Sequence, residues 1–466
     1  MFIGRDKELE TLEKCYLSNK FEFIVMYGRR RVGKTALISK FIEDKSAIYI
    51  MGIESNEEQN LANLSQSIFE FELGKEVKSQ FHNFQEALNY IFELSLEKRV
   101  ILAIDEYPYI AKSDMSLSSV LQGLIDKYRN DSKLMLILCG SSMSFMEQEV
   151  LAYKAPLHGR RTAQMKLNPF EYKEVIKYFK NVSPLDSAYY YGIVGGTPQY
   201  LIQVNQNLSI KENLIENVLN PNAFLYSEPE NLLKQEMREV AMYNAILTAI
   251  ANGSSRVSEI ASKVGESTAM VSTYLRNLIA LQLVSKAVPY GEKQGKKTIY
   301  RLNDPLFQFW FRFIPQLTSL ISRGASEQAY QYIAPHLDQY MGYIFEKICT
   351  EYLWQRLLQN DLSFTFLDLA SWWGNNTQTK KQEEIDIMGT SGHAAVFGEC
   401  KWKNERVGTQ VLDQLIERSQ MFPYVENHYF LFSKTGFTPA CQERAEQLGN
   451  VELVTFADIY TYLSQI

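Results

Sequence analysis

Three charged side chains interrupt two apolar stretches near the C-terminal end of the chain. Asp386 lies in EIDIM, and Glu399 and Lys401 lie two residues apart in VFGECK. The turn GTSGH between the stretches predicts a β-hairpin. Because residues two apart share a face of a strand, Glu399 and Lys401 point the same way, and the hairpin brings Asp386 close to them. Ile385 and Ile387 are expected to lie together on the opposite face.

Two carboxylates and a lysine at one end of a sheet suit the hydrolysis of a phosphodiester. Asp386 and Glu399 would hold one or two Mg²⁺ ions and leave coordinated waters in place. Lys401 would orient such a water or stabilise developing negative charge. Glu346, in the helical stretch GYIFEKICTEYL, would add a carboxylate, and Gln414, in the helix after the hairpin, would contact the nucleophile or the lysine. The alternative is an ordinary solvated or ion-paired face.

A second chemical motif lies near the N-terminus. GRRRVGKT matches G-x-x-x-x-G-K-[ST] between an apolar strand and a helix, which is the context of a phosphate-binding loop. Gly28 and Gly33 let backbone N–H groups surround phosphate oxygens. Lys34 reaches the β- and γ-phosphates, and the Thr35 hydroxyl binds Mg²⁺. The intervening residues of this predicted ATP or GTP site are Arg29, Arg30, Arg31 and Val32.

Polar residues follow the next two apolar strands. VILAIDEYP contains Asp105, whose carboxylate would hold the Mg²⁺, and Glu106, which would polarise the attacking water. LILCGSS ends in hydroxyls, and Ser141 or its neighbour would contact the γ-phosphate or the water; an ordinary polar turn is the alternative. In GRR, Arg160 or Arg161 would stabilise transition-state charge on the nucleotide of a neighbouring subunit; an ordinary basic loop is the alternative.

The elements that must position these residues fall into five segments. Residues 1–170 alternate buried strands with helices, which predicts an α/β parallel sheet. Residues 171–230 are mostly helical. In residues 231–304, three amphipathic helices precede two strands joined by a Gly/Lys tip, which is the order of a winged helix. Connecting helices (305–334) lead to a second α/β domain (335–466).

Charge separates the predicted winged helix from the rest of the chain. The formal net charge is −6, which argues against a protein that coats polyanions generally. Residues 231–304 nevertheless carry a local charge of +4. The candidate recognition helix begins near Ser267 and carries Arg276, and the wing tip carries Lys293, Lys296 and Lys297. We expect this segment to bind DNA, with the helix in a groove and the wing on phosphates.

Cysteine usage and hydropathy indicate the compartment. The five cysteines form no CxxC pair, so neither a disulfide framework nor a structural zinc site is expected. No apolar run reaches the roughly 18 residues of a membrane span. The start, MFIGRDKELE, is charged too early for a signal peptide. A cytoplasmic protein without a membrane partner is predicted.

The N-terminal half resembles STAND-type AAA+ ATPases of the archaeal-ATPase branch. The likeness rests on FIGRDKEL, YGRRRVGKT, DEYP, LILCGSS, PLHGRRT and GGTPQYL, and it covers about residues 1–205. It implies a P-loop AAA+ core with a helical subdomain, nucleotide-driven switching and a homo-oligomer. By the same resemblance, Arg5 would lie near the nucleotide and Pro198 near the base.

The C-terminal part, about residues 335–466, resembles the PD-(D/E)xK nuclease superfamily. The likeness rests on Glu346, on WWGNN before EEIDI, on ECK and on the following VLDQL helix. The predicted fold class is therefore α/β multidomain: a P-loop AAA+ parallel sheet with its helical subdomain, a winged helix-turn-helix and a restriction-endonuclease-like α/β domain. The predicted activity is ATP hydrolysis coupled to DNA binding and Mg²⁺-dependent cleavage. Two alternatives stay open: a non-cleaving ATP switch with a relict nuclease fold, and a STAND-type scaffold whose winged helix contacts protein.

Overall fold

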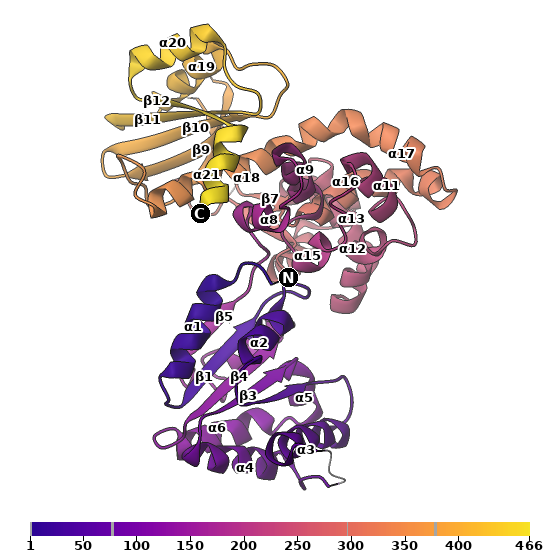
Figure 1. Cartoon of the computed structure of the whole chain (residues 1–466). Coiled ribbons are helices and arrows are strands. Elements are labelled where there is room, and N and C mark those ends of the chain that lie inside the picture. The colour runs from indigo at the N-terminus through magenta and orange to yellow at the C-terminus, as the bar shows by residue number, and fades with distance from the viewer. Residues whose placement is uncertain (1, 76–78, 296, 377–379) are drawn as a thin grey trace. The chain divides into compact units, whose positions relative to one another are not determined.

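The chain divides into two compact units. The structure is a computed structural model that describes residues 2–75, 79–295, 297–376 and 380–466 (Figure 1). Unit 1 consists of Met1–Pro169 with Thr197–Gln199, and unit 2 of Phe170–Gly196 with Tyr200–Ile466.

Unit 1 is built on a parallel sheet of five strands, in the order β2-β3-β4-β1-β5. The central strands are buried along almost their whole length, as their unbroken apolar sequences predict. The five strands are β1 (Glu22–Tyr27), β2 (Ala47–Met51), β3 (Val100–Asp105), β4 (Leu134–Gly140) and β5 (Ala163–Lys166).

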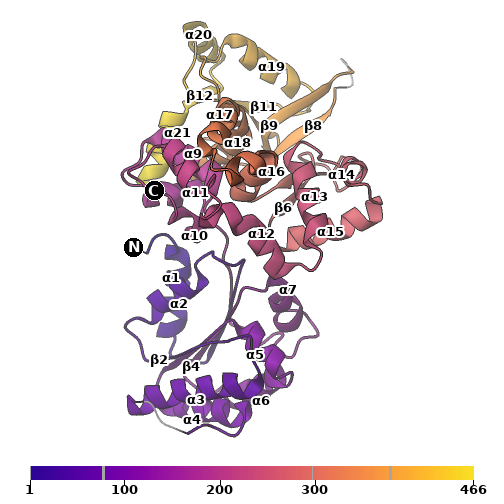
Figure 2. The same cartoon turned by 90° about the vertical axis from the view of Figure 1, so that its right-hand side faces the viewer.

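Helices cover both faces of this sheet. The N-terminal pair, α1 (Asp6–Leu17) and α2 (Lys34–Ile42), shares one apolar core with the sheet. The opposite face packs against α3 (Glu57–Leu73), α4 (Phe84–Glu97), α5 (Tyr107–Ser113), α6 (Leu117–Tyr128) and a π-helical turn, Met146–Val150, that follows α7 (Met143–Phe145). Figure 2 shows this three-layer arrangement, which places the carboxyl ends of β1, β3 and β4 at one edge of the sheet.

Unit 2 begins with short helices and continues with three helices and a β-hairpin. The first group comprises α8 (Tyr172–Tyr178), α9 (Pro184–Val194), α10 (Pro198–Leu201), which begins in unit 1, α11 (Ile210–Asn217) and α12 (Phe224–Glu236). The next elements, which we call the helix–hairpin segment, are α13 (Val240–Ala251), α14 (Val257–Val264), α15 (Thr268–Ala280), β6 (Val284–Ala287) and β7 (Ile299–Leu302). Strands β6 and β7 pair antiparallel.

Three helices lead from the hairpin to a second sheet. They are α16 (Pro305–Ser322), α17 (Ser326–Ile333) and α18 (Leu337–Leu358). The sheet has the order β12-β11-β10-β9-β8, with β8 to β10 antiparallel and β10 to β12 parallel. Its elements are β8 (Ala370–Asn375), β9 (Gln382–Ser391), β10 (Ala394–Lys401), α19 (Thr409–Ser419), β11 (Glu426–Ser433), α20 (Pro439–Leu448), β12 (Val451–Thr455) and α21 (Phe456–Gln465).

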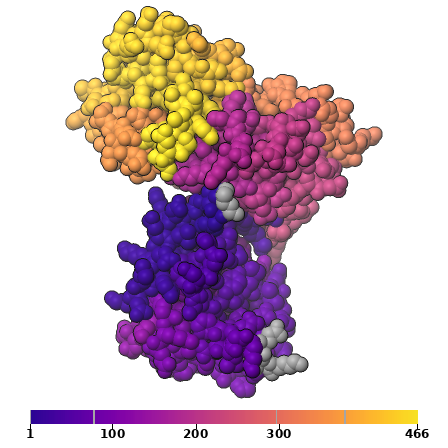
Figure 3. Space-filling model, viewed as in Figure 1, coloured from indigo at the N-terminus to yellow at the C-terminus, as the bar shows by residue number. Residues whose placement is uncertain are grey.

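The second sheet also has an apolar core on each face. One core contains residues of α18 and α21, and the other contains residues of α19 and α20. Helix α21 packs against α8, and the Lys177 ammonium donates to the backbone oxygen of Ile466 at 3.0 Å. Figure 3 shows these C-terminal residues in yellow beside the first helices of unit 2 in magenta. The ends of unit 2 are therefore packed together.

Strand β9 does not alternate regularly, so one expectation from the sequence is wrong. Ile385 packs in the core beneath α19 and α20, whereas Ile387 packs in the core beneath α18. The cause is a register shift: β8 advances from Ala370 to Trp372 while β9 advances from Met388 to Ile385. A β-bulge of this kind adds one residue to a strand and redirects the side chains beside it. Asp386 lies inside this irregular stretch.

Candidate functional site

The GRRRVGKT loop of unit 1 joins the end of β1 to the start of α2. Gly33 precedes the helix with φ +90°, in the left-handed region that favours glycine. The Lys34 ammonium donates to the backbone oxygens of Gly28 at 3.0 Å and Arg29 at 3.1 Å. Burial lowers the pKa of Lys34. A buried cation at the N-terminus of a helix is well placed to attract the phosphates of a nucleotide.

Two acidic residues at the end of β3 contact the loop and β4. The Thr35 hydroxyl donates to Asp105 Oδ2 at 2.6 Å, so the two predicted Mg²⁺ ligands touch each other. Tyr49, which the motif did not reveal, donates to the same oxygen at 3.2 Å. Glu106 has φ +49° and accepts from the Ser141 hydroxyl at 2.8 Å and its backbone N–H at 3.2 Å. Ser141 thus contacts Glu106.

Residues distant in the sequence complete the surroundings of the loop. Arg5 donates to the backbone oxygens of Val32 at 2.9 Å and Asn168 at 2.6 Å. Arg29 donates to the Thr197 hydroxyl at 3.0 Å, and Pro198 lies next to Gly33. Arg30 of the same loop donates to the hydroxyl of Tyr109 at 2.9 Å. Its neighbour Arg31 has a backbone φ of +72°.

The basic loop after residue 156 is held by contacts within unit 1. Arg160 forms a two-pronged pair with Asp126, with Nε–Oδ1 at 2.8 Å and Nη2–Oδ2 at 2.6 Å. It also donates to the backbone oxygens of Pro156 and His158. The neighbouring Arg161 has a buried Nη1 without a hydrogen-bond partner. Of the two, Arg161 is therefore the one whose guanidinium forms no ion pair with a carboxylate among the described residues.

Gly28 gives a direct test of the loop geometry. A Cβ at this position would lie 2.3 Å from the backbone oxygen of Leu167, whose N–H is bonded to Tyr27. We expect Gly28→Ala to lower the free energy of unfolding by about 2–3 kcal/mol, because the backbone must move to admit the methyl group. The control is Gly123→Ala in α6, where a Cβ meets nothing within 4 Å. Thermal unfolding of both variants checks this; equal midpoints would contradict the close approach.

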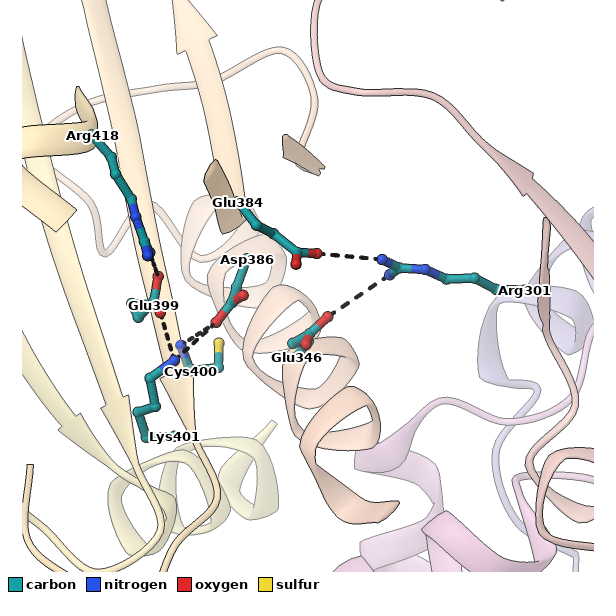
Figure 4. Close-up of polar contacts among 8 residues, drawn as sticks. All are labelled: Arg301, Glu346, Glu384, Asp386, Glu399, Cys400, Lys401 and Arg418. Atoms are coloured by element: carbon teal, nitrogen blue, oxygen red, sulfur yellow. Dashed lines mark hydrogen bonds and ion pairs between the residues drawn. The ribbon is translucent and has the colours of Figure 1, made fainter. Parts of the chain in front are cut away.

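The charged residues of the second sheet lie together between β9, β10, α18 and α19 (Figure 4). The Lys401 ammonium lies 2.5 Å from Glu399 Oε1 and 3.9 Å from Asp386 Oδ2. Asp386 Oδ2 also accepts the backbone N–H of Cys400 at 2.8 Å. Glu399 is 9% exposed and Asp386 14% exposed at the side chain, so both carboxylates are largely withdrawn from water.

Burial makes this cluster electrostatically unusual. Burial and the charge of Glu399 raise the pKa of Asp386 to about 7. Burial and the charge of Asp386 raise the pKa of Glu346 to about 8. Burial opposes the charge on Lys401, but the two neighbouring carboxylates raise its pKa above the usual value. The cluster therefore attracts positive charge, whether a proton or a cation.

Four residues of the cluster were not predicted from the sequence. Arg418 of α19 contacts Glu399 Oε2 at 3.2 Å and Glu383 Oε2 at 3.0 Å. It lies one turn after the predicted Gln414, which is exposed, so the helix was identified but not the contacting residue. From the opposite side, Arg301 of β7 approaches Glu384 Oε1 at 3.5 Å and Glu346 Oε2 at 4.0 Å (Figure 4). The acidic run before Asp386 was the one available signal for Glu383 and Glu384.

The carboxylates of the cluster suit a cation such as Mg²⁺, which takes only part of its ligands from the protein. Within the described ranges, no three His, Cys, Asp or Glu side chains converge as a ready-made metal cage. Mg²⁺ is usually held by one or two carboxylates together with waters and substrate phosphates. Asp386 and Glu399 could supply such a pair, with Lys401 now lying between them.

The pKa shifts predict how stability depends on pH. Because the pKa of Asp386 is raised to about 7, the folded chain keeps a proton that the unfolded chain releases at lower pH. The pKa of Glu346 is likewise raised, to about 8. The free energy of unfolding should therefore fall, on the order of 2 kcal/mol for each of the two carboxyls, as pH rises from about 4 to about 8, and then level off. Thermal unfolding in EDTA without nucleotide checks this. Asp386→Asn should make the fall smaller and leave the part due to the buried Glu346. Mg²⁺ should raise the midpoint most above about pH 7. A profile unchanged by Asp386→Asn would contradict the prediction.

The helix–hairpin segment offers one exposed helical face. In α15, Thr268, Met270, Thr273 and Arg276 are exposed, and Asn277 donates to the Tyr243 hydroxyl at 2.7 Å. The hairpin instead contacts the second sheet: Tyr290 N–H donates to Ser371 O at 3.0 Å, and Trp373 Nε1 donates to Lys297 O at 3.1 Å. Lys297 also pairs with Glu292, while Lys296 lies outside the described residues.

Comparison with known proteins defines the class of protein. Residues 2–204 match the model of an ATPase domain predominantly from Archaea, and residues 310–412 match a family of archaeal and bacterial proteins of unknown function. The Walker-type ATPase PABY2304 of Pyrococcus abyssi has a similar fold, with a TM-score of 0.51 and 20% identity over 67% of this chain and 96% of that chain. Residues 2–204 therefore form a P-loop ATPase domain of this archaeal type.

Sequence relatives place the whole chain in a family. The uncharacterized protein MJECL04 of Methanocaldococcus jannaschii is 33% identical over 408 residues, which cover 87% of this chain and 88% of the relative. The chain belongs to the same family. The uncharacterized ATP-binding protein MJ0423 of the same organism is 58% identical over 45 residues, or 10% of this chain and 76% of the relative. No helix in the described part of the chain is long and apolar enough to span a membrane.

Proposed function

We propose that this ATPase binds DNA and cleaves phosphodiester bonds with Mg²⁺ in its C-terminal domain, under the control of the bound nucleotide. The observation that carries the proposal is the position of Lys401, within ion-pair distance of both Asp386 and Glu399 at the end of a buried sheet. Buried carboxylates beside a lysine form an arrangement suited to phosphodiester hydrolysis, and Glu346 adds a third acid close by.

The chain's own residues have distinct roles in this proposal. Asp386 and Glu399 would hold Mg²⁺, which when bound supplies Lewis acidity and an activated water. Lys401, whose ammonium lies near both carboxylates, would stabilise the charge that develops on the scissile phosphate. Arg418 keeps Glu399 in position from α19. The backbone N–H of Cys400 fixes Asp386.

DNA binding is assigned to the helix–hairpin segment acting as a winged helix. Helix α15 is preceded by a serine cap, Ser267, and exposes Thr268, Thr273 and Arg276 along one side. Such a helix can enter a major groove. Since the hairpin contacts β8 through Tyr290, α15 rather than the wing is the surface proposed for duplex DNA.

In the proposed ATPase site, Thr35 and Asp105 would hold the Mg²⁺ of ATP and Glu106 would polarise the attacking water. The contact between Thr35 and Asp105 and the contact between Glu106 and Ser141 support these roles. A homo-oligomer, in which Arg161 approaches a neighbouring nucleotide, is part of the proposal. Light scattering with and without ATP measures it; an unchanged monomer mass would exclude this part.

A non-cleaving switch is the second candidate function. The observation that favours it is that Glu399 is already paired with both Lys401 and Arg418, which reduces its availability to a cation. In this case the carboxylate cluster would be a structural ion-pair network. ATP would still control DNA binding.

Cleavage assays separate the two candidates. Plasmid, linear duplex and single-stranded DNA, and RNA, are incubated with the intact protein in Mg²⁺, Mn²⁺ or EDTA, each with and without ATP. Metal-dependent cutting that changes with ATP supports the proposal. Absence of cutting on every substrate, with ATP hydrolysis intact, would favour the non-cleaving switch.

A further inference from the structure

A partly open cavity within unit 2 adjoins the carboxylate cluster. Its volume is about 570 Å³, within the ~300–1,000 Å³ usual for ligand pockets. The walls come from the end of α13, from β7, and from α16, α17 and α18. Glu346, beside Asp386, forms part of one wall. A molecule bound in the cavity would therefore reach the proposed cleavage site.

The cavity wall is basic, with two arginines against one acid. Arg312 rests on the Phe313 ring at 5.6 Å, and no carboxylate of the described residues lies within 4.0 Å of its guanidinium. Arg301 lies 5.0 Å from the centre of the Tyr343 ring, and its ion pairs with Glu384 and Glu346 are long. Both guanidinium groups keep donors for an added anion, and guanidinium geometry matches phosphate.

Aromatic and amide groups line the rest of the cavity. Tyr332 is 47% exposed, and its hydroxyl lies 3.3 Å from Gln316 Oε1. Tyr343 and Tyr300 also line the wall. The Gln308 side-chain oxygen is buried without a hydrogen-bond donor in the described chain. A buried acceptor without a donor is costly and suits the amino group of a ligand.

We propose that this cavity binds one or two unpaired nucleotides at the end of a DNA strand. Phosphates contact Arg301 and Arg312, a base stacks on an exposed tyrosine such as Tyr332, and an exocyclic amino group donates to Gln308. Base faces are available for such stacking only when the nucleotide is unpaired. DNA is favoured because α13 of the cavity wall belongs to the segment whose α15 is proposed to bind duplex DNA. The consequence for cleavage, a preference for single-stranded ends or flaps, rests on the proposed function.

Binding in EDTA tests the cavity without requiring cleavage. The probe is a fluorescent oligodeoxycytidylate of about ten nucleotides, whose bases carry an exocyclic amino group, measured by anisotropy with the full-length protein. Arg312→Gln is expected to weaken binding about five- to tenfold and to lower the salt slope by about 0.7. Tyr332→Ala, at an exposed position, should weaken it about fivefold. The matched control is Arg323→Gln, which removes an exposed charge at the end of the same helix outside the cavity and should change affinity less than about twofold.

The outcomes distinguish the cavity from the nuclease proposal. Affinity for a blunt duplex should be equal in the intact protein and in Arg312→Gln. Unchanged oligodeoxycytidylate binding by both cavity variants, or an equal loss in Arg323→Gln, would overturn the inference while leaving any cleavage intact. Tighter binding of an RNA of equal length would also overturn it. Loss of binding in the cavity variants, with no cleavage by the intact protein in Mg²⁺, supports the cavity and counts against the nuclease.

Discussion

Glu106→Gln is expected to slow ATP hydrolysis by about 10²–10³-fold while leaving ATP affinity almost unchanged. The carboxylate lies beside Asp105 at the end of β3 and accepts two hydrogen bonds from Ser141. Glutamine keeps an acceptor for Ser141 but cannot polarise a water as a base. Lys34→Ala should instead weaken nucleotide binding itself, because the buried ammonium lies within the loop. Phosphate release at saturating ATP and titration with a fluorescent nucleotide measure the two effects separately.

The matched control for this variant is Glu97→Gln, an exposed glutamate at the end of α4 in the same unit. It should leave both hydrolysis and affinity within about twofold of the intact protein. Hydrolysis by Glu106→Gln at the rate of the intact protein would show that another group activates the water. A parallel loss of affinity would show that Glu106 supports the loop rather than the chemistry.

The ATPase fold could be predicted from the sequence because its signals are local. The eight-residue motif GRRRVGKT lies directly between an apolar strand and a helix. The next two apolar strands end in polar residues, in DE and in SS. Parallel strands must then bring Thr35, Asp105 and Glu106 to one edge of the sheet. Tyr49 could not be identified in this way, since it contacts Asp105 from β2 without belonging to any motif.

The charged cluster of the second sheet was only partly predictable. The alternation of side chains along a strand and the length of the turn determine the register of the β9–β10 hairpin. That register brings Asp386 near Glu399 and Lys401. The β9 bulge has no comparable sequence signal, and it places Ile385 and Ile387 in different cores. It depends on how β8 pairs, which is a tertiary property.

Arg301 illustrates why long-range partners cannot be predicted from spacing. It lies 45 residues before Glu346 and in a different segment, yet it approaches both Glu346 and Glu384. The contact exists because the hairpin packs on β8 through Tyr290 and Lys297. Under the proposed function, movement of the helix–hairpin segment would change the charge around Glu346.

Asp386→Asn is expected to abolish metal-dependent cleavage, with a loss of at least about 10³-fold, and to preserve ATP hydrolysis. The substitution keeps the acceptor for the Cys400 N–H but removes one of the two carboxylates available to a cation. Removing a buried charge whose pKa is raised to about 7 should also stabilise the cation-free protein above neutral pH, so a folding defect does not account for lost cleavage. Initial cleavage rates in Mg²⁺, measured beside thermal unfolding in EDTA, check both effects.

Asp413→Asn is the matched control for this substitution, because Asp413 is an exposed carboxylate of α19 that pairs with Arg444 at 3.4 Å. It removes the same charge from the same domain and should cleave at the rate of the intact protein. Equal cleavage by Asp386→Asn and Asp413→Asn would exclude Asp386 from the reaction and reduce the cluster to an ion-pair network. Loss of cleavage in Asp386→Asn alone, together with the predicted gain in unfolding temperature, would indicate a catalytic role for Asp386. A carboxylate that stabilised the fold would lower the unfolding temperature when removed, so the gain would exclude a structural role.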